Sequence, residues 1–137
     1  MDAKTKQSII DIVRSCEVLQ LCTFGLGEYP ETRTVMNGLN RDVADLNLHF
    51  LTRKDSSKYG QIAANPHCCL YYFDSATRHS VRLFGLVSAM PMSAEFWSDE
   101  WRAFGYSGAD DPKVAVLAFA PKSYKFYIGE KEFKGEI

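Results

Sequence analysis

Short segments rich in β-forming residues recur along this chain and are separated by short polar turns. The Val81 segment alternates between two sets of side chains, and Pro121 separates the last two segments. So many short segments with so little chain between them favour an antiparallel barrel, closed or partly closed. The segments are Val18 to Phe24, Thr32 to Asn37, Asn47 to Thr52, Cys68 to Phe73, Val81 to Ala89, Val114 to Phe119 and Tyr124 to Ile128.

Three other segments have helical patterns and are expected to cover the openings or the edges of the barrel. Apolar residues recur on one face of a helix over residues 3 to 16. Ser56 or Ser57 provides a cap for a short helix that stops before Asn65-Pro66. Residues 94 to 104 are expected to form a third helix. The fold class is therefore mainly β with flanking α, with about six to seven strands and three to four helices.

The length of 137 residues favours a single domain over residues 1 to 137. The formal charge of −1 provides no global attraction to nucleic acid or to anionic membranes, so we expect neither partner. The polar N-terminal residues are not followed by an apolar segment, so we expect no signal peptide, and no apolar run reaches transmembrane length. We therefore expect a cytoplasmic protein.

The cysteines and histidines do not form a metal-binding pattern. The four cysteines include no CxxC pair, and adjacent Cys68 and Cys69 point to opposite faces of a strand. His49, His67 and His79 are scattered. We expect buried free thiols in a reducing compartment and no metal site.

The segment from Phe50 to Lys58 has the pattern of an anion site. A strand ends at Thr52, a polar turn follows, and a helix begins with Ser56, Ser57 and Lys58. The first amides of a helix are unpaired donors with partial positive charge, which suits a phosphate group. Arg33 opens a neighbouring predicted strand, from which its guanidinium would be able to bind the same phosphate in bidentate fashion. The alternative is an ordinary capped helix with solvated charges.

The order and spacing of several short motifs resemble the pyridoxamine 5'-phosphate oxidase-like FMN-binding split barrels, and most closely their short, general stress protein-like branch. The resemblance covers about residues 5 to 128 and implies an antiparallel split β-barrel. The motifs are Arg33-Thr34-Val35-Met36, Phe50-Leu51-Thr52, Ser56-Ser57-Lys58, Gln61-Ile62, Asn65-Pro66 and Val81-Arg82-Leu83-Phe84-Gly85.

The resemblance implies an FMN cofactor and a role for each matching residue. Arg33 and Lys58 would bind the phosphate, and Thr52 and Ser56 would bond phosphate or ribityl oxygens. Leu51 belongs to the same cofactor-binding segment. Ser57 replaces an arginine that the oxidases use, and Arg53 is available to compensate. The remaining implied contacts are with the flavin ring, through the backbone of Thr34, Val35, Met36 and Asn37 and through Ser80.

The resemblance also implies a homodimer with the flavin at the subunit interface. Residues of the Val81 strand and of the segment from Trp97 to Phe104 would then reach the partner's flavin, although we expect the two tryptophans to be core or dimer contacts. The expected role is that of a flavin-dependent oxidoreductase acting on a small molecule, with a reduced nicotinamide as donor. No residue stands out as catalytic. Pyridoxamine phosphate oxidation itself is not expected, because the C-terminal arginine and histidine motif is absent.

Four alternatives remain open from the sequence, and the last of them is a purely structural dimer with an empty site. The first is a non-enzymatic flavin-binding stress-response protein. The second is a haem-binding relative with His67 or His79 as the iron ligand. The third is a deazaflavin-binding relative, which would need more positive charge near its longer tail.

Overall fold

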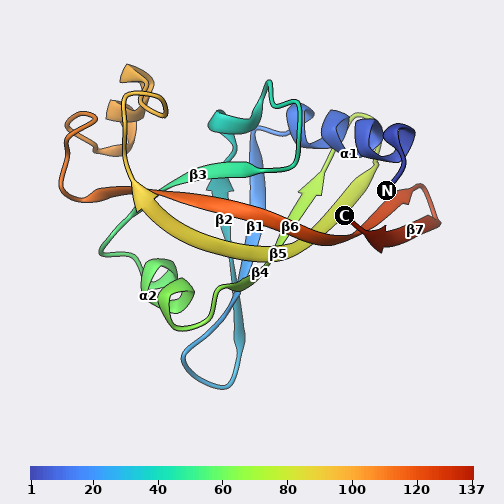
Figure 1. Cartoon of the computed structure of the whole chain (residues 1–137), viewed down its shortest axis with the longest axis horizontal. Helices are drawn as coiled ribbons and strands as arrows, with labels where there is room; N and C mark the ends of the chain where they lie inside the picture. The colour runs from blue at the N-terminus through green and yellow to red at the C-terminus, as the bar shows by residue number, and fades with distance from the viewer.

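The computed structural model describes residues 1–137 and consists of seven antiparallel strands with two α-helices and two short 3₁₀ helices (Figure 1). No helix is both long enough and apolar enough to span a membrane. The elements in chain order are α1 (Ala3–Ser15), β1 (Val18–Phe24), β2 (Pro30–Met36), η1 (Gly38–Asn40), β3 (Leu48–Arg53), α2 (Ser57–Ala64), β4 (His67–Phe73), β5 (Ser80–Pro91), η2 (Asp99–Phe104), β6 (Val114–Ile128) and β7 (Lys131–Glu136).

The strands form an open barrel whose two end strands do not pair with each other. The spatial order is β2-β1-β4-β5-β6-β3, with β7 added to the far end of β6, and every pair is antiparallel. β2 thus forms one edge of the sheet, and β3 together with β7 forms the other. This arrangement confirms the expected antiparallel split barrel with flanking helices.

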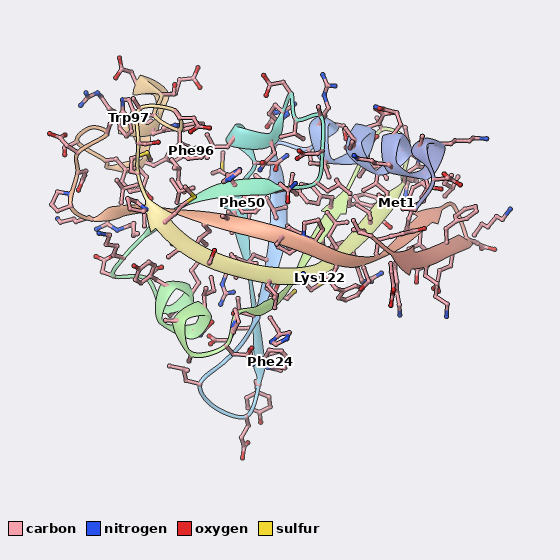
Figure 2. All side chains as sticks on the ribbon, viewed as in Figure 1. Met1, Phe24, Phe50, Phe96, Trp97 and Lys122 are labelled. Carbon is pink, nitrogen blue, oxygen red and sulfur yellow. The ribbon has the colours of Figure 1, made fainter.

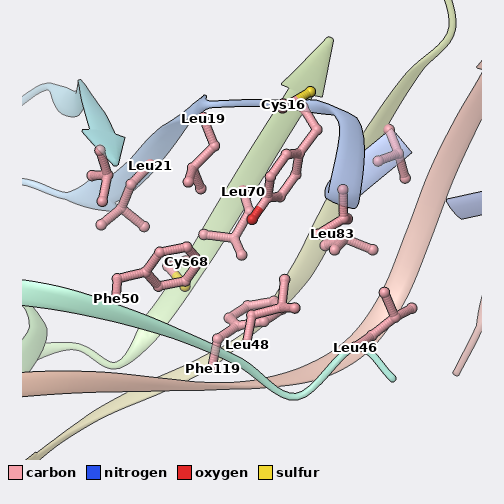
Figure 3. Close-up of a cluster of buried hydrophobic side chains, with 14 of the residues drawn as sticks. Cys16, Leu19, Leu21, Leu46, Leu48, Phe50, Cys68, Leu70, Leu83 and Phe119 are labelled. Atoms are coloured by element: carbon pink, nitrogen blue, oxygen red, sulfur yellow. The ribbon is translucent and has the colours of Figure 1, made fainter. Parts of the chain in front are cut away.

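The core lies between the inner face of the sheet and α1. Figure 3 shows Phe50 and Phe119 facing Leu21, Leu70 and Leu83 across the barrel interior. All five side chains are at most 2% exposed. Burial of side chains of this size stabilises the fold by about 1.5–3 kcal/mol each. The helix face predicted from the sequence, including Ile9, Ile12 and Val13, is buried against this cluster.

Asn37 links the end of α1 to the end of β2. Its side chain is fully buried, and its Nδ2 donates to the carbonyl oxygens of Val13 at 2.7 Å and Cys16 at 2.8 Å. Its Oδ1 accepts from the Tyr72 hydroxyl at 2.8 Å. A buried amide with all of these partners is satisfied, so it fixes where β2 ends and η1 begins.

The C-terminal third differs from the expectation drawn from Pro121. Instead of two strands broken at that residue, β6 is one strand that runs through it and pairs with β5 throughout. The register of β5 shifts between Phe84 and Gly85, opposite the proline, and this irregularity accommodates a residue with no N–H to donate. A Cβ on Gly85 would lie 2.2 Å from the Ala120 carbonyl oxygen, so the close approach requires glycine.

One further expectation was wrong in extent. The helix predicted over residues 94–104 is only the 3₁₀ helix η2, and residues 94–98 form turns and extended chain. The charged C-terminal tail forms β7, in which Phe133 packs against Phe126 with 5.7 Å between ring centroids. The strongly charged sequence of this strand hid its single inward-facing aromatic residue.

Candidate functional site

A cavity of about 180 Å³ lies between the two edges of the sheet, and we call it the edge cavity. Thr34, Val35 and Met36 of β2 line one side, and Leu51 of β3 with Lys58 of α2 lines another. The cavity therefore lies where the barrel is split. Its complete lining is Thr34, Val35, Met36, Gly38, Leu39, Leu51, Lys58, Trp101, Phe104 and Tyr106.

Lys58 and Arg33 place two positive charges near this cavity, and neither side chain is paired with a carboxylate. Burial lowers the pKa of the half-buried Lys58 ammonium, and the nearby Arg33 charge lowers it further. The ion pairs of the chain are Arg53–Asp55 and Arg102–Asp99, so neither Lys58 nor Arg33 takes part in one. Two partly desolvated cations side by side favour an anionic ligand.

Hydroxyl groups gather beside these cations at the start of α2. Thr52 is 1% exposed, and its Oγ1 lies 3.3 Å from Ser56 Oγ. Ser56 is the N-cap residue, but its Oγ donates to the Arg53 carbonyl oxygen at 2.7 Å instead of accepting from a helix amide. The side chain of Ser57 is exposed. The Tyr59 amide donates to the Ser56 carbonyl oxygen at 3.2 Å. Because the Ser56 side chain does not cap the helix, the amides of Ser57 and Lys58 remain available as donors.

Arg53 does not supply the charge that Ser57 lacks. Its Nε and Nη2 donate to the two carboxylate oxygens of Asp55 at 3.0 and 3.1 Å. This bidentate pair raises the pKa of Arg53 and lowers the pKa of Asp55. The positive charge available to a ligand is therefore that of Arg33 and Lys58, and we call Arg33, Thr52, Ser56, Ser57 and Lys58 the cation corner.

The structure brings together most of the residues predicted from the sequence, but not all of them. Five line the edge cavity and the cation corner adjoins it. The Asn37 side chain instead points inward to α1, as described above. Ser80 lies apart at the start of β5, between Phe73 and Tyr127, and is 8% exposed. The cofactor roles of these residues stay predictions.

Sequence reasoning missed the aromatic wall of the cavity. Trp101 packs directly on Gly38, where a Cβ would lie 2.4 Å from the indole Cη2. The indole Nε1 donates to the Phe96 carbonyl oxygen at 3.1 Å, and Tyr106 joins the same buried cluster. Figure 2 shows Phe96 and Trp97 on this excursion between β5 and β6, at the end of the molecule away from Met1. The excess of aromatic residues from Trp97 to Tyr106 was the only available signal.

Comparison with known proteins gives a match to the family model described as pyridoxamine 5'-phosphate oxidase like, over residues 4–133. The chain belongs to the pyridoxamine 5'-phosphate oxidase-like family. A search of curated proteins gives no match. Many solved structures share the fold, and three of them illustrate its range.

A Clostridium acetobutylicum protein related to general stress protein 26 of B. subtilis has a TM-score of 0.84 at 22% identity, covering 100% of this chain and 97% of its own. An FMN-binding protein from Nostoc punctiforme has a TM-score of 0.72 at 18% identity, covering 100% and 98%. A protein named F420 reductase has a TM-score of 0.65 at 16% identity, covering 83% and 93%. Likeness at these identities shows the shared fold of the family.

Few of the side chains that line the edge cavity can donate or accept a proton. Lys58 and Tyr106 are the only side chains in its lining that titrate. Burial raises the pKa of Tyr106, so its hydroxyl stays protonated at neutral pH. No carboxylate, histidine or cysteine lines the cavity. The arrangement can bind an anion beside an apolar, aromatic surface, and any redox chemistry has to come from a bound group.

Proposed function

We propose that this chain binds FMN, with the phosphate at the cation corner and the ring edge against the backbone of residues 34–36 in the edge cavity. The observation that carries the proposal is the pair of cations, Arg33 and Lys58, which have no carboxylate partner beside an apolar cavity. A phosphate compensates both charges and accepts from the free amides of α2. The flavin ring would lie against the apolar and aromatic side chains that line the edge cavity.

The second part of the proposal is a homodimer with the flavin at the subunit interface. A cavity of about 180 Å³ is smaller than the ~300–1,000 Å³ typical of small-molecule sites. The rest of a flavin site must then come from another surface, and a second copy of the chain supplies it. Sedimentation of the purified protein tests this part, because a monomer that holds FMN tightly would contradict it.

The third part is an oxidoreductase role with an organic small molecule as substrate and a reduced nicotinamide as donor. Bound FMN supplies hydride and electron transfer. The protein's residues supply binding, orientation and a largely apolar surface at the ring. Anaerobic addition of a reduced nicotinamide tests this role, because a flavin that does not bleach would instead indicate a non-enzymatic carrier.

The same geometry favours FMN over the other two cofactors. The edge cavity contains no histidine, and His67 and His79 both lie outside it, so an iron ligand for haem is lacking there. A deazaflavin with a longer anionic tail needs more positive charge, yet Arg53 is paired with Asp55. The visible spectrum of the purified protein separates flavin from haem.

Charge removal at the cation corner tests the placement of the phosphate. Lys58→Ala and Arg33→Ala are each expected to weaken FMN binding by about 1.5–3 kcal/mol, the scale of a hydrogen bond to a charged group. Lys4→Ala, which removes an exposed lysine from the first turn of α1, is the matched control and leaves affinity unchanged. Fluorescence titration measures all three, and unchanged affinity in both test variants would refute the placement.

A further inference from the structure

A buried polar network holds one end of the Arg33 guanidinium. Its Nη1 donates to Thr23 Oγ1 at 2.8 Å and to the Leu21 carbonyl oxygen at 3.2 Å. Its Nη2 donates to Gln61 Oε1 at 2.9 Å. Thr23 and Gln61 are each 3% exposed, so these contacts are shielded from water.

The contacts leave two donors of Arg33 free. A guanidinium has five N–H groups, and the two on Nη1 and one on Nη2 are engaged. The remaining Nε–H and second Nη2–H point the same way from one edge of the planar group. Two parallel N–H donors match two oxygens of one phosphate. The contacts of Nη1 and Nη2 with the protein therefore leave the edge formed by Nε and Nη2 open for bidentate binding of a phosphate.

The orientation of the Gln61 amide follows from its three partners. Its Oε1 accepts from the Thr23 hydroxyl at 2.6 Å as well as from Arg33. Its Nε2 donates to a carboxylate oxygen of Glu31. A flipped amide would point its NH₂ at two donors and its oxygen at a carboxylate, so only one orientation satisfies the network.

We propose that Gln61 is a positioning residue for anion binding, acting through Arg33. It fixes the end of the guanidinium so that the free edge faces the phosphate at the cation corner. Lys58 and Gln61 are three residues apart in α2 and lie on neighbouring positions of one helix face. One helix thereby places both cations of the site. This inference rests on the proposed function, since it requires a ligand that carries a phosphate.

Comparison of FMN with riboflavin separates positioning from a general structural role, because riboflavin lacks the phosphate. In Gln61→Met, which keeps an unbranched side chain of similar length, FMN affinity is expected to fall about tenfold. Riboflavin affinity is expected to change by less than about twofold, because no contact to the ring is altered. The matched control is Gln7→Met, at an exposed glutamine of α1 that bonds only Asp11.

A double-mutant cycle supplies the second readout. In the Arg33→Ala background, Gln61→Met is expected to cause no further loss of FMN affinity, because the residue acts through the arginine. Gln61→Glu, whose carboxylate would pair with Arg33, is expected to lower FMN affinity at least as much while riboflavin still binds. This variant keeps the test informative if Gln61→Met does not fold.

Three results would overturn the proposal. Equal loss of FMN and riboflavin affinity in the two Gln61 variants would show a merely structural role. Full additivity of Arg33→Ala and Gln61→Met would show that the two residues act independently. A parent protein that binds no FMN would overturn the proposed function together with this inference, whereas the first two results would leave FMN binding intact.

Discussion

The edge cavity and a larger hollow elsewhere in the molecule are lined by different kinds of side chain. The larger hollow, which we call the groove, has a volume of about 730 Å³ and lies over β1, β4 and β5. Its lining is Cys22, Thr23, Phe24, Pro30, Asn65, His67, Cys68, Cys69, Phe84, Gly85, Leu86 and Lys122. The edge cavity has a volume of only about 180 Å³.

The difference shows that the size of a hollow does not indicate its chemistry. The groove contains thiols whose pKa values are raised, and the imidazole Nδ1 of His67 already contacts Asn65 Oδ1 at 2.9 Å. The edge cavity contains a lysine with a lowered pKa, and an arginine beside it has two free donors. A perturbed group without a partner indicates a ligand site better than volume does.

The largest expected effect concerns the thiols of the groove. Burial raises the pKa of Cys68 from 9.0 to about 12 and that of Cys69 to about 11. The thiolate fractions at neutral pH are therefore about 1,000-fold and 100-fold below those of ordinary thiols. Alkylation followed by mass spectrometry should show slow labelling in the folded protein and fast labelling in urea. Rapid labelling of folded Cys69 would mean that the groove is reactive after all.

The next effect is the pH dependence of the FMN binding that we propose at the cation corner. The lowered pKa of Lys58 means that the free protein loses this proton at a lower pH than an ordinary lysine. If the proposed phosphate site is right, FMN binds the protonated form more tightly, so its affinity should fall by up to about tenfold per pH unit above that pKa and level off near the affinity of Lys58→Ala. In Lys58→Arg the charge persists above pH 12, so the decline should disappear. Titrations across the alkaline range decide between the two profiles.

A smaller effect is expected from the wall of the edge cavity. In Gly38→Ala the new Cβ meets the Trp101 ring, which must shift within its cluster. Overpacking of this kind typically costs about 1–3 kcal/mol of unfolding free energy. Gly60→Ala is the control, because its Cβ meets nothing within 4 Å in α2 and should stabilise the helix by about 0.5–1 kcal/mol. Equal midpoints of denaturation in the two variants would contradict the close packing of Trp101 on Gly38.

The smallest effect is on the stability of the ligand-free protein. The lowered pKa of Lys58 means that its charged form is less favourable in the folded than in the unfolded chain. Lys58→Met should therefore raise the Tm at neutral pH, by about 1–3 °C, and the gain should shrink at alkaline pH where the lysine is neutral. On the proposed function, FMN should raise the Tm of the parent, and this increase should be smaller in the same variant. If Lys58→Met had a lower Tm than the parent without FMN, the Lys58 charge would not destabilise the folded protein.

The sequence predicted the antiparallel barrel and the strand–turn–helix segment from Thr52 to Lys58, because both follow from local patterns. Strand alternation and the Thr52-to-Lys58 turn are readable from neighbouring residues. The partners of Arg33 were not predictable, because Thr23 and Gln61 reach it only through the pairing of β1 with β2 and the packing of α2. The continuity of β6 through Pro121 depends on the shifted register of β5, which no local pattern records. Placement of Trp101 on Gly38 is likewise a long-range contact.

The two unpaired edges of the sheet have a consequence for the handling of this protein. The outer backbone groups of β2 and β3 lack a neighbouring strand, and such edges are templates for self-association. A ligand that contacts both edges shields them and ties the ends of the sheet together. Loaded protein should therefore show slower amide hydrogen exchange in β2 and β3, and cofactor-free preparations should aggregate sooner on storage.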